Sequence, residues 1–154
     1  MAGNVIVIAG PTASGKTALS VALARELGGE IVSADSMQVY RGMDIGTAKA
    51  TAAEQREAAH HMLDVADPGE AYSAARYVDE AAECCGDILA RGRLPVITGG
   101  TGLYIDSLLS GRSFADTEDS RELREAIARE YDERGGAAML EKLRQIDPQR
   151  AAIL

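Results

Sequence analysis

The sequence predicts an α/β fold in which helices flank a parallel sheet. Three observations predict it: short apolar runs of strand length, segments of helical period between them, and a glycine-rich loop directly after the first run. Continuous apolar runs are typical of strands that are covered on both faces, as parallel strands are. Strands that alternate with helices indicate connections that cross over such a sheet.

The first strand, helix and strand follow one another without a gap. Residues 4–9 are apolar and largely β-branched, and we expect a strand buried on both faces. From Gly15 apolar residues recur at helical spacing until a glycine pair at 28–29 supplies a left-handed stop. Residues 30–34 read as the second strand, which ends at Asp35. The apolar positions of the helix are Leu19, Ala22, Leu23 and Leu27.

Two further helices are indicated by their capping residues. Thr51 with Glu54 three positions later fits a capping box, which predicts a short helix through His60. Ser73 precedes a longer helix that Gly92 ends. Its apolar stripe consists of Ala74, Tyr77, Val78, Ala81, Cys85 and Ile88.

The third strand is predicted at residues 94–98, with Pro95 near its start, where a missing N–H is tolerated. The glycine-rich residues 99–102 must then form a tight loop. We therefore expect residues 1–112 to be the α/β core.

Residues 113–154 differ in character and are predicted to be a helical insertion. A polar connection over 113–117 leads to a charged amphipathic helix that ends at Gly135 and Gly136, and another helix follows. The apolar positions of these two helices are Leu123, Ala126 and Ile127, then Met139, Leu140 and Leu143.

Composition limits the function classes. The chain has 154 residues, 46% hydrophobic and 26% charged, which suits a globular protein that needs neither disulfides nor metal to fold. The only cysteines, Cys84 and Cys85, are adjacent in a helical pattern, so we expect them to be structural. No run is long enough to span a membrane and the N-terminus lacks a signal-peptide pattern, which predicts a cytoplasmic protein.

The net charge of −8 argues against broad binding to a nucleic-acid backbone. Its distribution is uneven, because residues 1–50 hold four basic and four acidic side chains. A local positive site in that third of the chain therefore stays open.

The loop after the first strand carries the chemistry. It matches the phosphate-binding (P-loop) pattern in full, with a strand before it and a helix after it, which predicts a P-loop NTPase-like sheet. Backbone N–H groups would surround a phosphate, Lys16 would reach its outer oxygens, and Thr17 would ligate Mg²⁺. The loop consists of Gly10, Pro11, Thr12, Ala13, Ser14, Gly15, Lys16 and Thr17.

Such a loop serves nucleoside triphosphates and other diphosphate ligands alike. NTPases of this class usually have an aspartate after a later strand to hold Mg²⁺. Here the strand at 94–98 runs into Gly99, Gly100 and Thr101 with no acid, which is a poor fit to an ordinary ATPase.

Asp35 is the carboxylate at the carboxyl edge of the sheet, where ligands of such sheets bind. It is either a general base beside the phosphate site or a cap of its loop. Ser36 and Gln38 offer donors and acceptors suited to the edge of a base. Thr101 is either a turn residue or a hydroxyl aimed at the phosphate. For His60 and the adjacent His61 we expect a structural or capping role and no shared metal.

Four segments together, residues 10–17, 35–49, 60–64 and 99–104, closely resemble the tRNA dimethylallyltransferase (tRNA isopentenyltransferase) family. The resemblance covers essentially the whole chain. Members of that family transfer a dimethylallyl group from its diphosphate to the exocyclic amine of the adenine next to the tRNA anticodon. They continue beyond the point where this chain ends, and the resemblance implies that their second half carries much of the tRNA-binding surface.

The resemblance also implies roles for individual residues. Thr12 to Thr17 would hold dimethylallyl diphosphate with Mg²⁺, and Asp35 would be the base that accepts a proton from the amine. Asp35, Ser36, Met37 and Gln38 would contact the flipped nucleotide. Thr101 would stand between the donor and the adenine. Residues 113–154 would begin an insertion that grips the anticodon stem-loop, and we expect a monomer whose first 154 residues are inactive alone.

Three other functions stay open. A small-molecule or nucleotide kinase shares the loop and the sheet, and it would need arginines in a lid, for which Arg121, Arg124 and Arg129 are candidates with acidic neighbours. A binding module that responds to nucleotide without catalysis is a second alternative. The third is a prenyltransferase that acts on a free adenine nucleotide.

Overall fold

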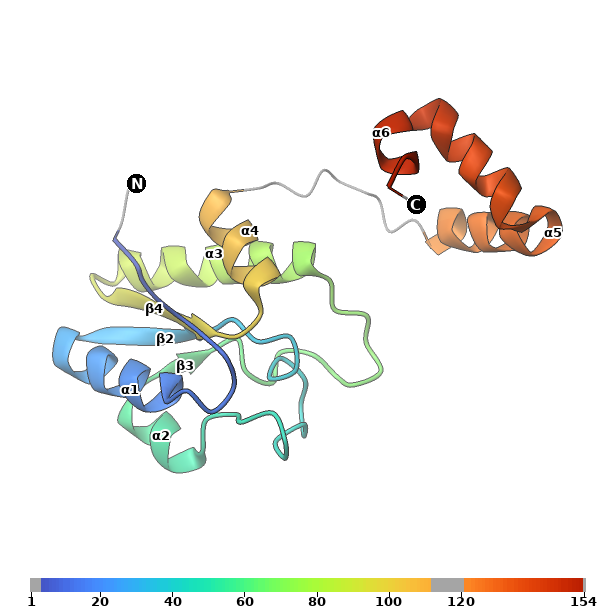
Figure 1. Ribbon diagram of the computed structural model, residues 1–154. Coiled ribbons are helices and arrows are strands. Elements are labelled where there is room, and N and C mark those ends of the chain that lie inside the picture. Colours follow the sequence, from blue (N-terminus) through green and yellow to red (C-terminus); the bar gives the residue numbers. More distant parts are fainter. Residues whose placement is uncertain (1–3, 112–120, 154) are drawn as a thin grey trace. The chain divides into compact units, whose positions relative to one another are not determined.

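A computed structural model describes residues 4–111 and 121–153 of the chain (Figure 1). The chain divides into two compact units, residues 1–113 and 114–154. The polar connection predicted at 113–117 lies outside the described residues.

A four-stranded parallel sheet forms the centre of the first unit. Its order is β1 (Ile6–Ala9), β4 (Leu94–Gly99), β2 (Gly29–Ser33) and β3 (His60–His61). The three predicted strands are confirmed. Since β4 lies between β1 and β2, it pairs with both. The connection from β1 through the first helix to β2 therefore passes over β4.

Helices cover both faces of this sheet (Figure 1). One face packs against α1 (Lys16–Leu27), with α2 (Ala52–Glu57) beside it. The other face packs against α3 (Ala74–Ala90) and α4 (Gly102–Ser110). The predicted stripe of α3 is confirmed, because Tyr77, Val78, Ala81, Cys85 and Ile88 are all buried in the core.

The tyrosine at the centre of that core links α3 to the end of a strand. The rings of Tyr77 and Tyr104 stack with centroids 4.0 Å apart, and the Tyr77 hydroxyl donates to the carbonyl of Ser33 at 3.0 Å. Burial of the phenol raises the pKa of Tyr77, so this hydroxyl stays a donor. The carboxyl end of β2 is thereby fixed from the helix side.

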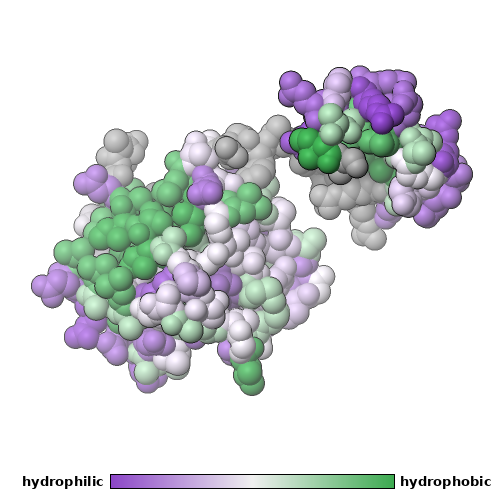
Figure 2. Space-filling model, in the orientation of Figure 1, coloured by the Kyte–Doolittle hydropathy of each residue, from purple (hydrophilic) through white to green (hydrophobic). Residues whose placement is uncertain are grey.

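Two expectations for the N-terminal elements are wrong. The strand β1 is half-buried, since among the described residues it pairs only with β4, and apolar side chains gather on the face of the first unit that it crosses (Figure 2). In α1 the predicted Leu19 and Leu27 are about half exposed. The buried side chains of α1 are instead Ser20, Val21 and Ala24, whose small size brings the helix close to the sheet.

The helix predicted through His60 is shorter than expected. It ends at Glu57, because Ala58 is extended and the next carbonyl, that of Ala59, accepts a hydrogen bond from the N–H of Ile31 at 2.8 Å. The histidine pair therefore lies on β3. The helix α4 follows the glycine loop directly and was not predicted.

The second unit consists of α5 (Arg121–Ile146) and α6 (Pro148–Ala151). A non-helical Gly135, with φ of 75°, divides α5 at the point where the sequence predicts a break. Asp147 caps α6 by accepting from the N–H of Arg150 at 3.0 Å. Across the described ranges, no helix is both long and apolar enough to cross a membrane.

Candidate functional site

Three loops meet at the carboxyl edge of the sheet, because the strands that precede them are parallel neighbours. The N–H of Gly10 donates to Gly99, and the N–H of Ala34 donates to Thr98 at 2.8 Å. The N–H of Thr101 then donates back to Ala34 at 3.1 Å. The phosphate-binding loop, Asp35 and Thr101 thus share one edge, as the sequence predicts.

The phosphate-binding loop leads into α1 through two residues in the left-handed region. Ala13 has φ of 62° and Gly15 has φ of 84°. Gly15 is the N-cap and supplies no side chain to the first turn of α1, which holds no acidic residue. The N–H groups of the first turn of α1 and the helix dipole therefore favour an anion at this end of the helix. The ammonium of Lys16 and the hydroxyl of Ser14 both donate to the Pro11 carbonyl, which keeps the lysine over the loop.

A cavity of about 290 Å³ lies over this loop. The cavity brings the loop, the end of β4 and two segments from the following connection together. The connection contributes Thr47 and Ala48, and α2 contributes Glu54, none of which the sequence indicated as site residues. The full lining is residues 12–18 with Asp35, Gln38, Thr47, Ala48, Glu54, Thr98 and Gly99.

Asp35 has one of the two roles that the sequence left open, because it caps its loop, and its role as a base stays a prediction. Its Oδ1 accepts from the N–H of Met37 at 2.9 Å and from that of Gln38 at 3.3 Å, so it does cap its loop. Within the described part of the chain, no hydrogen bond reaches Oδ2. The half-buried carboxylate lines the cavity. One oxygen therefore orders the loop while the other remains available for a proton.

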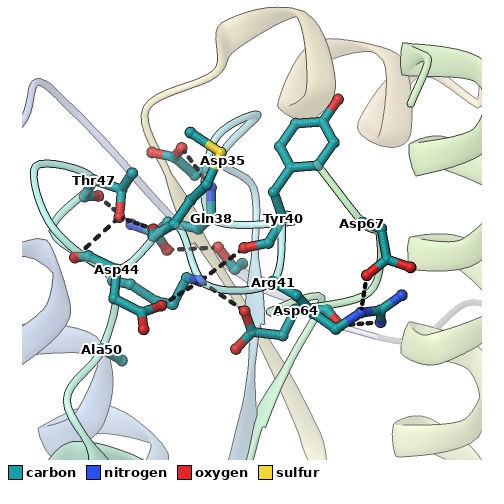
Figure 3. A network of polar contacts seen from close by, with 12 residues as sticks. Asp35, Gln38, Tyr40, Arg41, Asp44, Thr47, Ala50, Asp64 and Asp67 are labelled. Atoms are coloured by element: carbon teal, nitrogen blue, oxygen red, sulfur yellow. Dashed lines mark hydrogen bonds and ion pairs between the residues drawn. The ribbon is translucent and has the colours of Figure 1, made fainter. Parts of the chain in front are cut away.

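Gln38 is held by protein groups at both ends of its amide (Figure 3). Its Oε1 accepts from the hydroxyl of Ser33 at 3.0 Å. Its Nε2 donates to the carbonyls of Thr47 at 2.9 Å and Ala48 at 3.2 Å. The amide thus attaches the connection after β2 to the end of that strand.

Thr101 is engaged with the segment that follows Asp35. Its hydroxyl oxygen accepts from the N–H of Ser36 at 2.9 Å and lies 3.3 Å from the Ser36 hydroxyl. Thr101 does not contribute to the cavity lining. Met37, the residue after Ser36, is 45% exposed. An approach of Thr101 to a donor phosphate stays a prediction.

The donor set of the cavity suits a magnesium ion that arrives with a phosphate ligand. Thr17, which has a hydroxyl, and Asp35, which has a carboxylate, both line the cavity. Among residues 4–111 and 121–153 no group of three metal-ligating side chains occurs, so the protein alone offers no closed cage. Mg²⁺ commonly keeps several waters and takes one or two protein oxygens plus phosphate oxygens. The residues present fit that mode of binding.

The histidines lie on β3, away from this edge. His61 Nε2 lies 2.7 Å from Glu30 Oε2, and His60 Nδ1 lies 2.8 Å from the carbonyl of Ala58. The lid arginines of the kinase alternative belong to the second unit. Arg129 is exposed there, and the side chains of Arg121 and Arg124 lie outside the described residues.

Comparison with known proteins gives two family matches. The IPP transferase family model matches residues 38–154, and the isopentenyl transferase model matches residues 3–67. Among curated proteins, tRNA dimethylallyltransferase 1 of Pelobacter propionicus is 52% identical over 152 residues, which are 98% of this chain and 48% of that protein. The tRNA dimethylallyltransferase of an Anaeromyxobacter species is 55% identical over 149 residues, or 97% and 49% of the two chains.

Solved structures give the same result. The tRNA isopentenylpyrophosphate transferase of Bacillus halodurans superposes with a TM-score of 0.71 at 46% identity, covering 98% of this chain and 50% of that one. A eukaryotic dimethylallyltransferase acting on tRNA superposes with a TM-score of 0.82 at 34% identity, covering 97% and 37%. The chain spans about half the length of the curated relatives it matches.

Proposed function

The chain belongs to the IPP transferase family, and on that premise we propose that its protein transfers a dimethylallyl group from the diphosphate to an adenine amine of tRNA. The observation that carries the proposal is the cavity that joins the phosphate-binding loop to Asp35. A kinase also needs the loop. Because kinases can also use an aspartate to accept a substrate proton, the match to the IPP transferase family is what favours prenyl transfer over phosphoryl transfer.

The phosphate-binding loop would hold the diphosphate of the donor. Negative charge grows on the diphosphate as the bond between its oxygen and the allylic carbon breaks. The N–H groups of the first turn of α1 and the ammonium of Lys16 would stabilise that charge. Mg²⁺ on the hydroxyl of Thr17 would supply further charge neutralisation when bound. No acid follows β4 in the usual position for an NTPase, which also favours a donor other than ATP.

Asp35 would accept the proton that the amine loses. In the transfer, the exocyclic nitrogen forms a bond to the allylic carbon, the carbon–oxygen bond breaks, and diphosphate leaves with the electron pair. The nitrogen must then release one proton. Oδ2 of Asp35 accepts no hydrogen bond from the residues that the structure describes, while Oδ1 holds the carboxylate in place through the N–H groups of Met37 and Gln38.

The acceptor would be the adenine adjacent to the tRNA anticodon, flipped out of its stack so that the amine reaches the cavity. The exposed Met37 and the neighbouring Ser36 would contact the flipped nucleotide. Gln38 would act chiefly by ordering the cavity, because its amide is already bonded to protein groups. Thr101 would order Ser36 through its hydroxyl. The charged helices of the second unit would contribute to the grip on the anticodon stem-loop, and the reaction would take place in the cytoplasm.

Two measurements test this proposal. Thermal unfolding should show stabilisation by dimethylallyl diphosphate with Mg²⁺ and a smaller effect of ATP at equal concentration. Lys16→Ala should remove the stabilisation, and Lys142→Ala, an exposed change in the second unit, should leave it intact. Mass spectrometry of tRNA from cells with and without the gene at its full natural length should show the prenyl mass on one adenine. Stabilisation by ATP alone, with unmodified tRNA, would favour the kinase.

A further inference from the structure

A buried cation lies behind the cavity and is not used by the chemistry described so far. The side chain of Lys49 is 4% exposed. Its ammonium donates to the carbonyl of Tyr40 at 2.9 Å, to Asp44 Oδ1 at 2.8 Å and to Asp64 Oδ1 at 2.7 Å. These three bonds use all three of its N–H groups, so the ammonium has none left for a ligand.

The three acceptors come from points of the chain that have no regular secondary structure to hold them. Tyr40 forms an isolated bridge with Ala66, and Asp64 has φ of 55°, an uncommon conformation for a residue other than glycine. Asp44 lies to one side of both, as the stick view shows (Figure 3). Lys49 therefore joins two connections, the one after β2 and the one after β3.

The bonds of Lys49 lead to two parts of the cavity. Directly before it, Thr47 and Ala48 form the cavity wall opposite the phosphate-binding loop, and Ala48 has φ of 52°. On the other side, the N–H of Asp64 donates to the carbonyl of Gln38 at 3.2 Å. Since Gln38 is one of the two residues whose N–H groups hold Asp35, the same cation supports both the wall and the base.

The charge of Lys49 is what keeps this arrangement together. Burial alone lowers the pKa of an ammonium, but the hydrogen bonds to Asp44 and Asp64 outweigh it, so the pKa of Lys49 is raised and the group stays charged. Without the ammonium, two carboxylates would face each other with no cation between them. The connections would then be held less firmly, because the two carboxylates repel each other and the carbonyl of Tyr40 keeps only the more distant N–H of Met43, at 3.4 Å, as a donor.

We propose that Lys49 is a positioning residue for the prenyl transfer: it fixes Thr47 and Ala48 opposite the phosphate-binding loop and, through Asp64, orders the backbone that holds Asp35. The role rests on the proposed function. Lys49 itself contributes nothing to the cavity lining. Its effect should therefore fall on the rate of transfer and on acceptor binding, and much less on the donor, whose loop is anchored separately by α1.

The experiment compares three variants of the protein at its full natural length. Lys49→Met removes the charge with little change in side-chain length, and Lys49→Arg restores a cation with several donors. Arg91→Met is the matched control, because it breaks another ion pair to a buried carboxylate, that of Glu30, near the opposite end of β2. Each variant is assayed well below its melting temperature for single-turnover transfer, for the KM of tRNA and for the affinity of dimethylallyl diphosphate.

We expect Lys49→Met to slow single-turnover transfer by at least about tenfold, since small displacements of reacting groups have effects of that size. Donor affinity should change by less than about threefold. Lys49→Arg should recover part of the rate, and Arg91→Met should lose stability while keeping the rate. A Lys49→Met variant that is only as impaired as Arg91→Met would overturn the proposal.

Two further measurements distinguish a failure of this proposal from a failure to fold and from a failure of the proposed function. If Lys49→Met does not fold, Asp44→Ala removes a single, largely exposed acceptor, and an unchanged transfer rate in that variant would equally overturn the proposal. If the unmodified protein transfers no prenyl group, the proposed function fails first. Hydrogen exchange then tests the positioning alone, because Lys49→Met should speed exchange in residues 43–49 and Arg91→Met should not.

Discussion

At the scale of single residues, Asp35 offers the sharpest test of the chemistry. Asp35→Asn keeps an oxygen that can accept from Met37 and Gln38 but removes the basicity of the carboxylate. Donor binding should survive, and single-turnover transfer should fall by about a hundred- to ten-thousand-fold. Asp35→Ala, which also loses the two loop hydrogen bonds, separates positioning from proton transfer. Normal turnover by Asp35→Asn would leave Asp35 as a loop cap only.

The adjacent cysteines should be chemically quiet. Burial raises the pKa of Cys85 to about 11, and burial likewise raises the pKa of Cys84. The thiolate is the reactive form of a cysteine, so the test uses a Cys84→Ser variant, in which Cys85 is the thiol that can react. At pH 8 the folded variant should react with an aromatic disulfide reagent at least about a hundredfold more slowly than the variant unfolded in denaturant. Absorbance of the released thiolate measures both rates. Fast stoichiometric labelling of the folded chain would mean that Cys85 is not in the core.

The sequence predicted residues well wherever the signal is local. The phosphate-binding loop and Asp35 stand out because each directly follows a strand, and a parallel sheet brings such positions to one edge. Thr47, Ala48 and Glu54 could not be found in this way. Thr47 and Ala48 reach the cavity through the path of an irregular connection, which depends on the buried Lys49 rather than on any periodic pattern, and that path also positions α2 with Glu54.

At the scale of elements, the contact between the end of β4 and the segment before Asp35 leaves no room for a side chain. A Cβ on Gly99 would lie 2.1 Å from the carbonyl oxygen of Ala34. Gly99→Ala should therefore destabilise the protein by roughly 1–3 kcal/mol or more and displace the loop that carries Asp35. Gly102→Ala is the control, since a Cβ there meets nothing within 4 Å. Denaturant unfolding measures the free energy of unfolding of both variants. Equal stability of the two would contradict the prediction.

Helices and strands were predicted correctly where their own residues carry a strong hydrophobic period or a capping residue. The α3 stripe was confirmed because its apolar residues have a single period and a capping serine. The buried face of α1 was missed because it consists of small residues, and hydropathy favours the leucines beside them. The two-residue β3 and the helix α4 were missed as well. A strand of two residues has no period, and α4 begins without a side-chain cap.

At the scale of the whole molecule, one carboxylate should govern part of the acid stability. Arg91, with His61, hydrogen-bonds Glu30 and lowers the pKa of its carboxyl from 4.5 to about 2. Because the folded pKa is the lower one, the stabilisation is complete above about pH 4.5 and is lost as the pH falls toward 2. The free energy of unfolding should thus decline over this range, and less steeply for Glu30→Gln. Equal slopes for the two proteins, measured by urea unfolding at each pH, would contradict this.

The strand order also sets the sequence of events by which this chain can fold. Ile6 of β1 and Ile31 of β2 both pair with Val96, so until β4 has been synthesised β1 lacks its partner in the sheet and β2 can pair only with the two-residue β3. When the phosphate-binding loop and α1 have been synthesised, the sheet that holds them in place has therefore not yet formed. Pairings between residues so distant in the chain form slowly. The nascent chain consequently carries exposed apolar strands through most of the synthesis of this unit, which is the interval in which we expect chaperones to matter most.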